Sequence, residues 1–448
     1  MPKRFVLPQL LSTIVALFFL STPGFATDHS KFFKEKFEFG QDVTLKCLEC
    51  HKDAAQQVMK TSHWTWSLEQ EIDGKKVRRG KINSFNNYCV SVYSNLAVCA
   101  SCHIGYGWTD HEFDFEDEEN VDCLVCHDST GAYKKNARGP LKRVDLLLVA
   151  QNVARPERGN CGTCHFFGGG GDAIKHGDLD SSMDFPSRDL DVHMDYESND
   201  FMCQDCHVTK EHQISGNAMT VSPTGQTGIG CNGCHTEAVH KSTVLNNHTA
   251  KVACQTCHIP EYAKELPTKT SWDWSTAGQS IRPKKDKYGK ENFMKKKGNF
   301  TYDMHITPAY AWYNGTSEVY QQGDKISTDL LRLTAPNGHR NDPKAKIYPF
   351  KVHTGKQPYD PENKILITPK LIGKDGFWKT YDWESASRIG MEETGLPFSG
   401  KIGFIATEMY WPLNHMVSPA DKALSCDDCH GFNGRLDWQA LGYSGDPD

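Results

Sequence analysis

The sequence of 448 residues is poor in apolar side chains: 38% of its residues are hydrophobic. After residue 26 no apolar run approaches the roughly 18 residues that a membrane-spanning helix needs. The formal net charge is only −6, so the composition offers no basic excess for binding nucleic acid. These shortages argue against a membrane-embedded protein and against a nucleic-acid-binding one.

Cysteine is almost absent outside a single repeated pattern. Sixteen of the 17 cysteines belong to eight copies of Cys-x-x-Cys-His, and Cys89 is the remainder. The paired cysteines are Cys47 and Cys50, Cys99 and Cys102, Cys123 and Cys126, Cys161 and Cys164, Cys203 and Cys206, Cys231 and Cys234, Cys254 and Cys257, and Cys426 and Cys429. The histidines that follow them are His51, His103, His127, His165, His207, His235, His258 and His430.

The spacing within each copy suits the attachment of a haem. Two thiols three positions apart can each add to one vinyl group, and the next histidine then lies under the iron as proximal ligand. A zinc site would need paired motifs that close a four-coordinate site, and a disulfide framework would not place histidine after every pair. The pattern therefore predicts eight covalently attached haem c groups, whose porphyrins would supply apolar interior that the side chains lack.

The first 26 residues have the pattern of a secretory signal peptide. Lys3 and Arg4 precede an apolar stretch, and Gly24-Phe25-Ala26 fits a small-residue cleavage site. We therefore expect a periplasmic protein, since haem is attached to c-type cytochromes on the outer side of the cytoplasmic membrane.

The spacing of the motifs divides the mature chain. Seven motifs fall within residues 27–265, the haem-rich region, while residues 266–420 have none and are rich in aromatics, as expected of a segment packed on the haem core and not of a disordered linker. Residues 421–448 carry the eighth motif. Helical periods are short, the best at residues 52–59, 141–153 and 420–424. The expected fold class is mainly α: a multihaem cytochrome c with short helices and long loops around a packed haem chain, and little sheet.

Histidines outside the motifs are numerous enough to supply second axial ligands. Twelve remain, and nine of them are the distal ligands that we expect: His29, His63, His176, His193, His212, His240, His248, His305 and His415. By count alone every haem could have two histidine ligands, which would suit electron transfer and leave no open iron. The count therefore does not separate an electron conduit from an enzyme.

Four stretches carry a resemblance to a known family: residues 61–66 (TSHWTW), 161–180 (CGTCHFFGGGGDAIKHGDLD), 191–194 (DVHM) and 410–416 (YWPLNHM). With the eight motifs and the long gap before the last, the chain resembles the octahaem tetrathionate reductases over essentially its whole mature length. The resemblance implies a periplasmic octahaem enzyme in which one haem, corresponding to the second motif (Cys99, Cys102 and His103), carries a distal lysine. That lysine corresponds to Lys175.

A lysine ligand makes chemical sense at an active haem. The amine must lose its proton against a pKa of about 10.4, so its bond to iron is easily displaced. When reprotonated, the same group is a cation that suits an anionic substrate. A solvated surface lysine is the alternative, but Gly168–Gly171 would allow a close approach of the backbone nearby. Asp172 could pair with the lysine or carry a proton, and a capping role is equally open.

Two further residues are candidates for the site. Cys89 is either inert buried packing or, since the resemblance implies a cysteine near the active haem, a residue that engages substrate sulfur or shapes the pocket. Lys264 is a weaker candidate for holding a dianion. The lysine-rich run at residues 282–297 is expected to be a solvated face that could steer anions. The acidic run at residues 110–119 is expected to be solvated, with docking of a cationic donor as the minor interpretation.

The reaction that the resemblance implies is reduction of tetrathionate to two thiosulfates, with the other haems relaying electrons from a periplasmic or membrane-associated donor. A nitrite or hydroxylamine reductase is one alternative, and a non-enzymatic electron conduit is another. No motif ends in lysine, so the proximal lysine of the pentahaem nitrite reductases is excluded.

Overall fold

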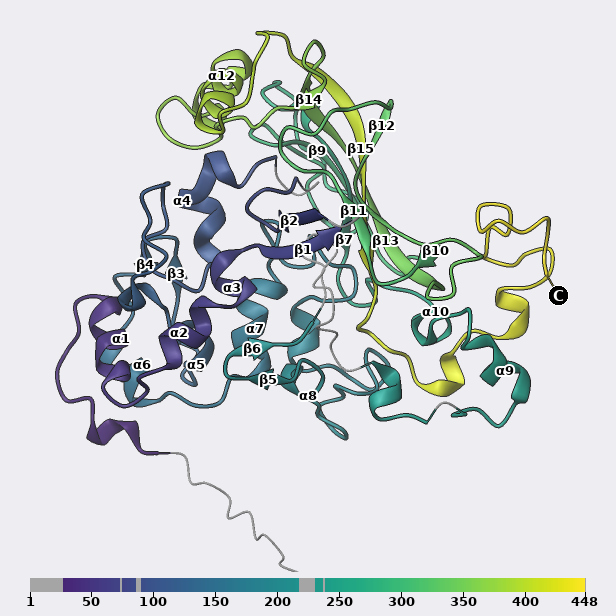
Figure 1. The fold of residues 1–448 in the computed structure, drawn as a ribbon, viewed down its shortest axis with the longest axis horizontal. Helices are drawn as coiled ribbons and strands as arrows, with labels where there is room; N and C mark the ends of the chain where they lie inside the picture. Colours follow the sequence, from purple (N-terminus) through teal and green to yellow (C-terminus); the bar gives the residue numbers. More distant parts are fainter. Residues whose placement is uncertain (1–26, 73–74, 86–89, 217–229, 237, 448) are drawn as a thin grey trace, which may run out of the picture.

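The structure is a computed structural model that describes residues 27–72, 75–85, 90–216, 230–236 and 238–447. The expected signal peptide and Cys89 lie outside these residues. Figure 1 shows a helical region below and to the left, a sheet that rises above it, and the C-terminal segment on the right. Within the described residues no helix is long and apolar enough to cross a membrane.

The helices are short, and long loops join them. The α-helices are α1 (Gly40–Leu48), α2 (Ala54–Met59), α3 (Ser62–Thr65), α4 (Leu96–Cys99), α5 (Leu124–His127), α6 (Leu146–Gln151), α7 (Arg158–His165), α8 (Cys203–Cys206), α9 (Thr243–His248), α10 (Cys254–His258), α11 (Phe377–Thr380) and α12 (Trp383–Glu393). The 3₁₀ helices are η1 (His29–Lys31), η2 (Tyr93–Asn95), η3 (Ala100–Cys102), η4 (Glu118–Asn120), η5 (Ser181–Asp184), η6 (Cys231–Gly233), η7 (Trp274–Thr276), η8 (Ala420–Lys422) and η9 (Cys426–Asp428).

All three predicted helical segments contain a helix, although each helix is shorter than its segment. Helix α2 occupies residues 54–59, α6 begins after Asp145, and the segment at 420–424 forms only η8. The carboxylate of Asp145 accepts hydrogen bonds from the amides of Leu147 and Leu148, and so fixes the start of α6.

Every Cys-x-x-Cys-His motif adopts a helical turn. Residues i, i+3 and i+4 share one face of a helix, so this turn presents both cysteines and the histidine on the same side. The amide of the histidine donates to the carbonyl of the first cysteine, four residues earlier, at His51, His127, His207, His235 and His430, while His165 and His258 are the last residues of helices α7 and α10. The local fold therefore places each trio where one planar group could contact all three.

The strands lie mostly in the haem-free segment. They are β1 (Leu68–Ile72), β2 (Lys75–Arg79), β3 (Lys135–Asn136), β4 (Gly139–Pro140), β5 (Thr209–Lys210), β6 (Gln213–Ile214), β7 (Thr268–Asp273), β8 (Phe293–Met294), β9 (Gly298–Asp303), β10 (Ala309–Tyr313), β11 (Ser317–Val319), β12 (Leu330–Pro336), β13 (Lys346–Asp360), β14 (Ile365–Leu366) and β15 (Gly403–Pro412). The first six form three separate two-stranded hairpins.

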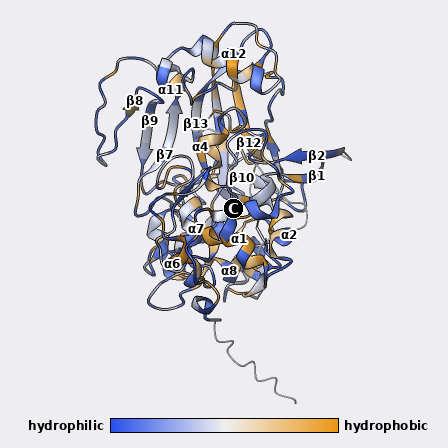
Figure 2. Cartoon of the chain, turned by 90° about the vertical axis from the view of Figure 1, so that its left-hand side faces the viewer, coloured by the Kyte–Doolittle hydropathy of each residue, from blue (hydrophilic) through white to orange (hydrophobic). Residues whose placement is uncertain are grey.

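The other nine strands form one sheet, in the order β11-β12-β15-β13-β7-β9-β8, with β10 and β14 also paired to β13. Strand β13 is the longest, at 15 residues, and its antiparallel ladder with β15 runs from Phe350 opposite Pro412 to Tyr359 opposite Gly403. Two neighbouring pairs are parallel, β12 with β15 and β13 with β7. Figure 2 shows β7, β8 and β9 at one edge and α11 and α12 at the far end from the haem-rich helices.

The sheet has its own apolar core. Its members include Trp272, Trp274, Phe300, Leu333, Phe377 and Met409, all at most 6% exposed. Trp272 and Trp274 stack at 4.8 Å between ring centres. The expectation of little sheet thus describes residues 27–265 but not residues 268–412. The aromatic and β-branched residues of the haem-free segment supply a core that no haem motif contributes to.

The sheet meets the haem-rich region along β13. The amide of Ala253 donates to the carbonyl of Ile347, the amide of Ile347 donates to the carbonyl of Lys251, and the hydroxyl of Thr256 donates to the Ile347 carbonyl. The residues before and within the seventh motif therefore extend the edge of this strand.

Candidate functional site

Six motif histidines each face one histidine from outside the motifs. The ring centres are 6.1–6.4 Å apart in the pairs His63–His165, His127–His212, His193–His235, His207–His415, His240–His258 and His248–His430. With a metal–imidazole bond of about 2 Å, and a ring centre roughly 1 Å behind its nitrogen, two rings that share one metal ion lie about 6 Å apart. The pairs therefore fit the axial ligands of iron in motifs three to eight.

Hydrogen bonds of the Nδ1 atoms support this fit. Nδ1 of His127 and of His207 lies 2.8 and 2.9 Å from the carbonyls of Ala154 and Ser215, and Nδ1 of His212 lies 2.9 Å from Oε1 of Gln57. A ligand histidine usually donates its other ring N–H to such an acceptor, which fixes the tautomer and leaves Nε2 for the metal. These acceptors thus suit the orienting partners that ligand histidines would need.

The motifs also lie against one another. Cysteine side chains lie within hydrogen-bonding distance between motifs one and three (Cys47 and Cys123), two and four (Cys102 and Cys164), four and five (Cys161 and Cys203), and six and seven (Cys231 and Cys254). Electrostatic interactions link three more pairs, namely Cys126 with Cys161, Cys206 with Cys234, and Cys257 with Cys429. All eight motifs therefore belong to one connected series.

Three histidines expected to be distal ligands are not brought opposite a motif histidine within the described residues. The ring of His29 lies 6.4 Å from that of Phe33, and His305 is an exposed residue whose Nδ1 faces Glu261. His176 packs edge-on against Trp411, at 5.2 Å between ring centres. For these three, ligation stays a prediction.

The second motif differs from the others in its turn. The amide of His103 donates to the carbonyl of Ala100, three residues earlier, because the chain passes from α4 into η3 within the motif. The side chain of His103 is 1% exposed, and its Nε2 lies 2.7 Å from the carbonyl oxygen of Trp64. The ring would have to turn away from that carbonyl to bind a metal through Nε2.

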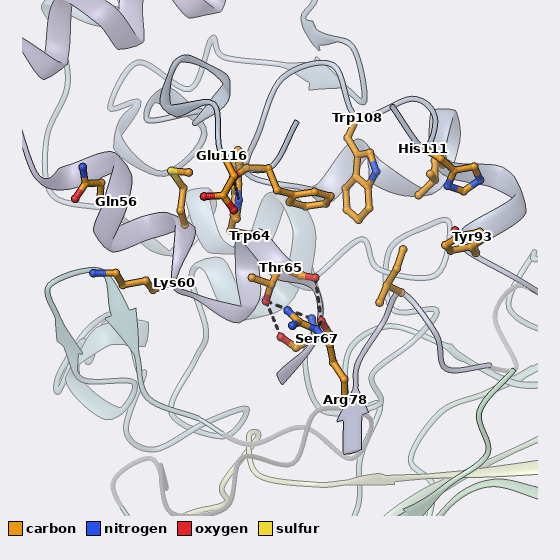
Figure 3. A pocket seen from close by; sticks show the side chains of 14 residues that line it. Gln56, Lys60, Trp64, Thr65, Ser67, Arg78, Tyr93, Trp108, His111 and Glu116 are labelled. Carbon is orange, nitrogen blue, oxygen red and sulfur yellow. Dashed lines mark hydrogen bonds between the residues drawn. The ribbon is translucent and has the colours of Figure 1, made fainter. Parts of the chain in front are cut away.

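An aromatic layer surrounds the His103 ring. The rings of Trp64, Trp66, Trp108, Phe113 and Phe115 lie 4.6–6.1 Å from it between centres. Trp64, Trp108 and Phe115 also line a cavity of about 740 Å³, whose polar lining includes Lys60, Arg78 and Glu116. Figure 3 shows Trp64 and Trp108 on one side of this cavity and Arg78, bonded to Ser67, on the other.

A buried ion pair ties the second motif to the third. Nζ of Lys135 lies 3.0 Å from Oδ2 of Asp122, and it donates to the carbonyls of His103 and Gly105. The hydroxyls of Tyr106 and Tyr133 also donate to Asp122. Since Asp122 directly precedes the third motif, this network fixes the two motifs relative to each other.

Lys175, the expected distal ligand, lies near the second motif. Its Nζ stands 4.7 Å from the centre of the Trp411 ring, and its charge interacts with the side chain of Cys102. Burial, reinforced by the nearby Lys81, lowers the pKa of Lys175 to about 8. A Cβ added to Gly168 would come within 3.2 Å of Cδ of Lys175, so a glycine is what lets the two segments approach this closely.

The other two charged candidates have different partners. The carboxylate of Asp172 accepts from the amide and the hydroxyl of Ser181. Lys264 donates to the carbonyls of Leu190 and Met416 and to the hydroxyl of Ser418. Cys89 lies outside the described residues.

The structure adds two buried lysines and a buried histidine that the sequence did not reveal. Lys351 and His353 on β13 are fully buried, and Lys269 on β7 is 4% exposed, with its Nζ over the rings of Trp272 and Phe300. Alternating charged residues in a strand ordinarily indicate a solvated face. Here that face is turned towards the interior. The neighbouring aromatic residues are the one signal in the sequence that indicates this burial.

Comparison with known proteins identifies the family. Residues 269–433 match the family model described as bacterial cytochrome c. An uncharacterised protein of Archaeoglobus fulgidus is 26% identical over 245 residues, which are 43% of this chain and 82% of that protein. The crystal structure of an octahaem cytochrome c from Shewanella oneidensis is 55% identical, with a TM-score of 0.90, over 94% of this chain and 98% of that one.

This identity extends over nearly the whole of both chains, and the paired histidines fit covalently bound haem c. The protein therefore belongs to the octahaem c-type cytochromes.

Proposed function

We propose that the protein is a periplasmic tetrathionate reductase that carries one haem on each of its eight motifs and reacts at the second. Lys175 would bind the haem iron there, as its distal ligand. The observation that carries the proposal is the position of Lys175, partly buried, beside Cys102 and over the Trp411 ring. Its lowered pKa reduces the cost of the deprotonation that metal binding requires. None of the described histidines faces His103, whereas motifs three to eight each have a facing histidine.

The residues around the second motif would act on the substrate by charge. When released from the metal and protonated, Lys175 is a cation, and Lys81 lies close enough to lower its pKa. Together they favour a dianion over a neutral molecule. A bound haem supplies electrons at this position.

The overall reaction balances without a proton. One tetrathionate takes up two electrons, its central sulfur–sulfur bond breaks, and two thiosulfates leave. In the version that uses Cys89, its thiolate attacks one central sulfur and releases the first thiosulfate. The resulting protein–sulfur bond is then cleaved by the two electrons, which frees the second thiosulfate and restores the thiolate.

The connected series of motifs supports electron relay to this position. The second motif touches the fourth through Cys102 and Cys164, and the fourth continues through motifs five, six, seven and eight. A donor outside the protein would therefore reduce one of several exposed motifs, and stored electrons would reach the second motif through the fourth.

The experiment is oxidation of reduced viologen by the purified holoprotein, with tetrathionate, nitrite and hydroxylamine as parallel acceptors. The proposal predicts turnover with tetrathionate that falls at least tenfold in Lys175→Ala and in Cys89→Ala, and not in the exposed-lysine control Lys142→Ala. Faster turnover with nitrite or hydroxylamine than with tetrathionate would show that the enzyme prefers nitrogen substrates. If no acceptor is turned over, the enzyme proposal is wrong and the protein is interpreted as a non-enzymatic electron conduit.

A further inference from the structure

Two side chains of the sheet hold four consecutive backbone carbonyls around Lys175. The hydroxyl oxygen of Thr268, on β7, lies 2.6 Å from the carbonyl oxygen of Ala173 and 3.1 Å from that of His176. Nζ of Lys351, on β13, lies 3.1 Å from the carbonyl oxygens of both Ile174 and Lys175. Each carbonyl of residues 173–176 therefore faces a polar group of the sheet, and the single hydroxyl hydrogen of Thr268 is shared between those of Ala173 and His176.

The two holding side chains are also bonded to each other. Nζ of Lys351 donates to the hydroxyl oxygen of Thr268 at 2.5 Å. Three oxygens therefore surround this Nζ: the carbonyl oxygens of Ile174 and Lys175 and the hydroxyl oxygen of Thr268. Both side chains are fully buried, so these bonds are shielded from competing water.

Making these hydrogen bonds with a buried lysine costs desolvation free energy. Burial drives the pKa of Lys351 well below its usual value, although the Asp178 carboxylate opposes that shift. Purely structural contacts between a loop and a sheet are ordinarily made by backbone amides or small hydroxyls, which carry no such penalty. The presence of a lysine indicates that the carbonyls it binds must stay in one arrangement.

The backbone between these carbonyls needs external support. Ala173 has a φ of 60°, a left-handed conformation that a residue with a Cβ adopts at a cost. Gly170, three residues earlier, has a φ of 96°. A backbone segment with this geometry persists only when neighbouring groups stabilise it. The hydrogen bonds from Thr268 and Lys351 provide that stabilisation.

We propose that Thr268 and Lys351 are positioning residues that hold residues 173–176 so that the Lys175 side chain is directed at the second motif. This inference rests on the proposed function, because it takes Lys175 to be the distal ligand. On this inference the nine-stranded sheet contributes to the reaction by fixing the backbone of residues 173–176. Only the Lys175 side chain then moves when it is released from the metal.

The test uses the ligand signature of the holoprotein. Low-temperature electron paramagnetic resonance and near-infrared magnetic circular dichroism distinguish a histidine–lysine haem from bis-histidine and high-spin haems. The variants are Thr268→Val, which keeps the shape and removes the hydroxyl, and Lys351→Met, which keeps the length and removes the ammonium. The matched control is Thr334→Val, since Thr334 is also fully buried in the sheet and its hydroxyl donates to the carbonyl of Tyr410.

Both variants should lower the ratio of lysine-bound to lysine-released haem by about tenfold, as loss of an orienting partner commonly does. The control should keep the wild-type spectrum even if it unfolds at lower temperature. If Lys351→Met does not fold, Thr268→Val by itself decides the question. Folded variants that retain the full histidine–lysine signal would overturn this inference and leave the proposed function standing, whereas a wild-type spectrum without that signal would overturn both.

Discussion

Nδ1 of His415 lies 3.2 Å from Oδ2 of Asp178, and the same oxygen accepts the backbone amides of Asn414 and His415. Burial by itself would raise the pKa of Asp178, but hydrogen bonding and charge from His415 outweigh it, and the pKa falls to about 2. An anionic carboxylate thus stands behind the histidine that faces His207.

Replacing this carboxylate should change one redox potential. A carboxylate behind a ligand histidine makes the ligand more basic and favours the oxidised metal. Asp178→Asn should therefore raise the potential of one haem by roughly 50 mV, which is on the order of a tenfold change in an equilibrium constant. Potentiometric titration measures this shift.

The matched control for that titration is Asp180→Asn. Asp180 is buried in the same segment, but its carboxylate accepts from Ser182 and from no ligand histidine. Equal shifts in the two variants would mean that the effect comes from buried charge in general and not from His415.

Asp122→Asn should be strongly destabilising. It leaves the buried ammonium of Lys135 without its counter-charge, and breaking one partner of a buried pair commonly costs about 3–5 kcal/mol. Tyr133→Phe removes only a neutral donor from the same carboxylate and should cost about 1 kcal/mol. Denaturant unfolding of the holoprotein measures both, and similar costs in the two variants would contradict the ion-pair explanation.

The carboxylate of Asp360 should make the sheet sensitive to acid. Burial would raise its pKa, but donation by the amides and side chains of Asn363 and Ser399 lowers it to about 2. A carboxyl whose folded pKa is depressed contributes stability above its unfolded pKa, and this is lost as pH falls towards the folded value. The contribution is about 2 kcal/mol for this shift.

This prediction is checked by unfolding the wild type and Asp360→Asn at several values of pH. The difference in unfolding free energy should be constant above about pH 4 and should shrink between about pH 4 and pH 2. A difference that stays constant across this range would show that another group controls the acid transition.

Gly168→Ala should weaken the lysine site without harming the fold. The added Cβ would meet Cδ of Lys175 at 3.2 Å and the carbonyl of Cys164 at 3.4 Å, so the lysine side chain must give way. Tetrathionate turnover should fall about tenfold, since a small misplacement near the reacting centre is costly. The control is Gly445→Ala, where a Cβ would meet nothing within 4 Å. An equal loss of turnover in this control would show that the contact between the Cβ at position 168 and Lys175 is not the cause.

The sequence predicted the haem chemistry better than it predicted the sheet. The eight motifs are local in sequence, and each folds as one helical turn. Six of the nine histidines expected as ligands do face a motif histidine. Which one faces which, as with His63 and His165, depends on long-range packing that no local pattern encodes.

The haem-free segment was harder to predict for a physical reason. The richness in aromatics indicated packing, yet Lys269 stands among threonines and Lys351 alternates with apolar residues, patterns that ordinarily indicate a water-facing side. The stretch at residues 410–416 carried the resemblance but gave Trp411 no role, and its contact with Lys175 appears only in the folded chain.

Strand β13 is bonded to the seventh motif through Ile347 and to the backbone around Lys175 through Lys351, four residues later. Side chains of a strand alternate between its two faces, so adding or removing one residue between these positions would turn Lys351 to the opposite face. The number of residues between Ile347 and Lys351 is therefore fixed by the two contacts that they make. Relatives that keep a lysine at the second motif should tolerate many substitutions there but no insertion or deletion.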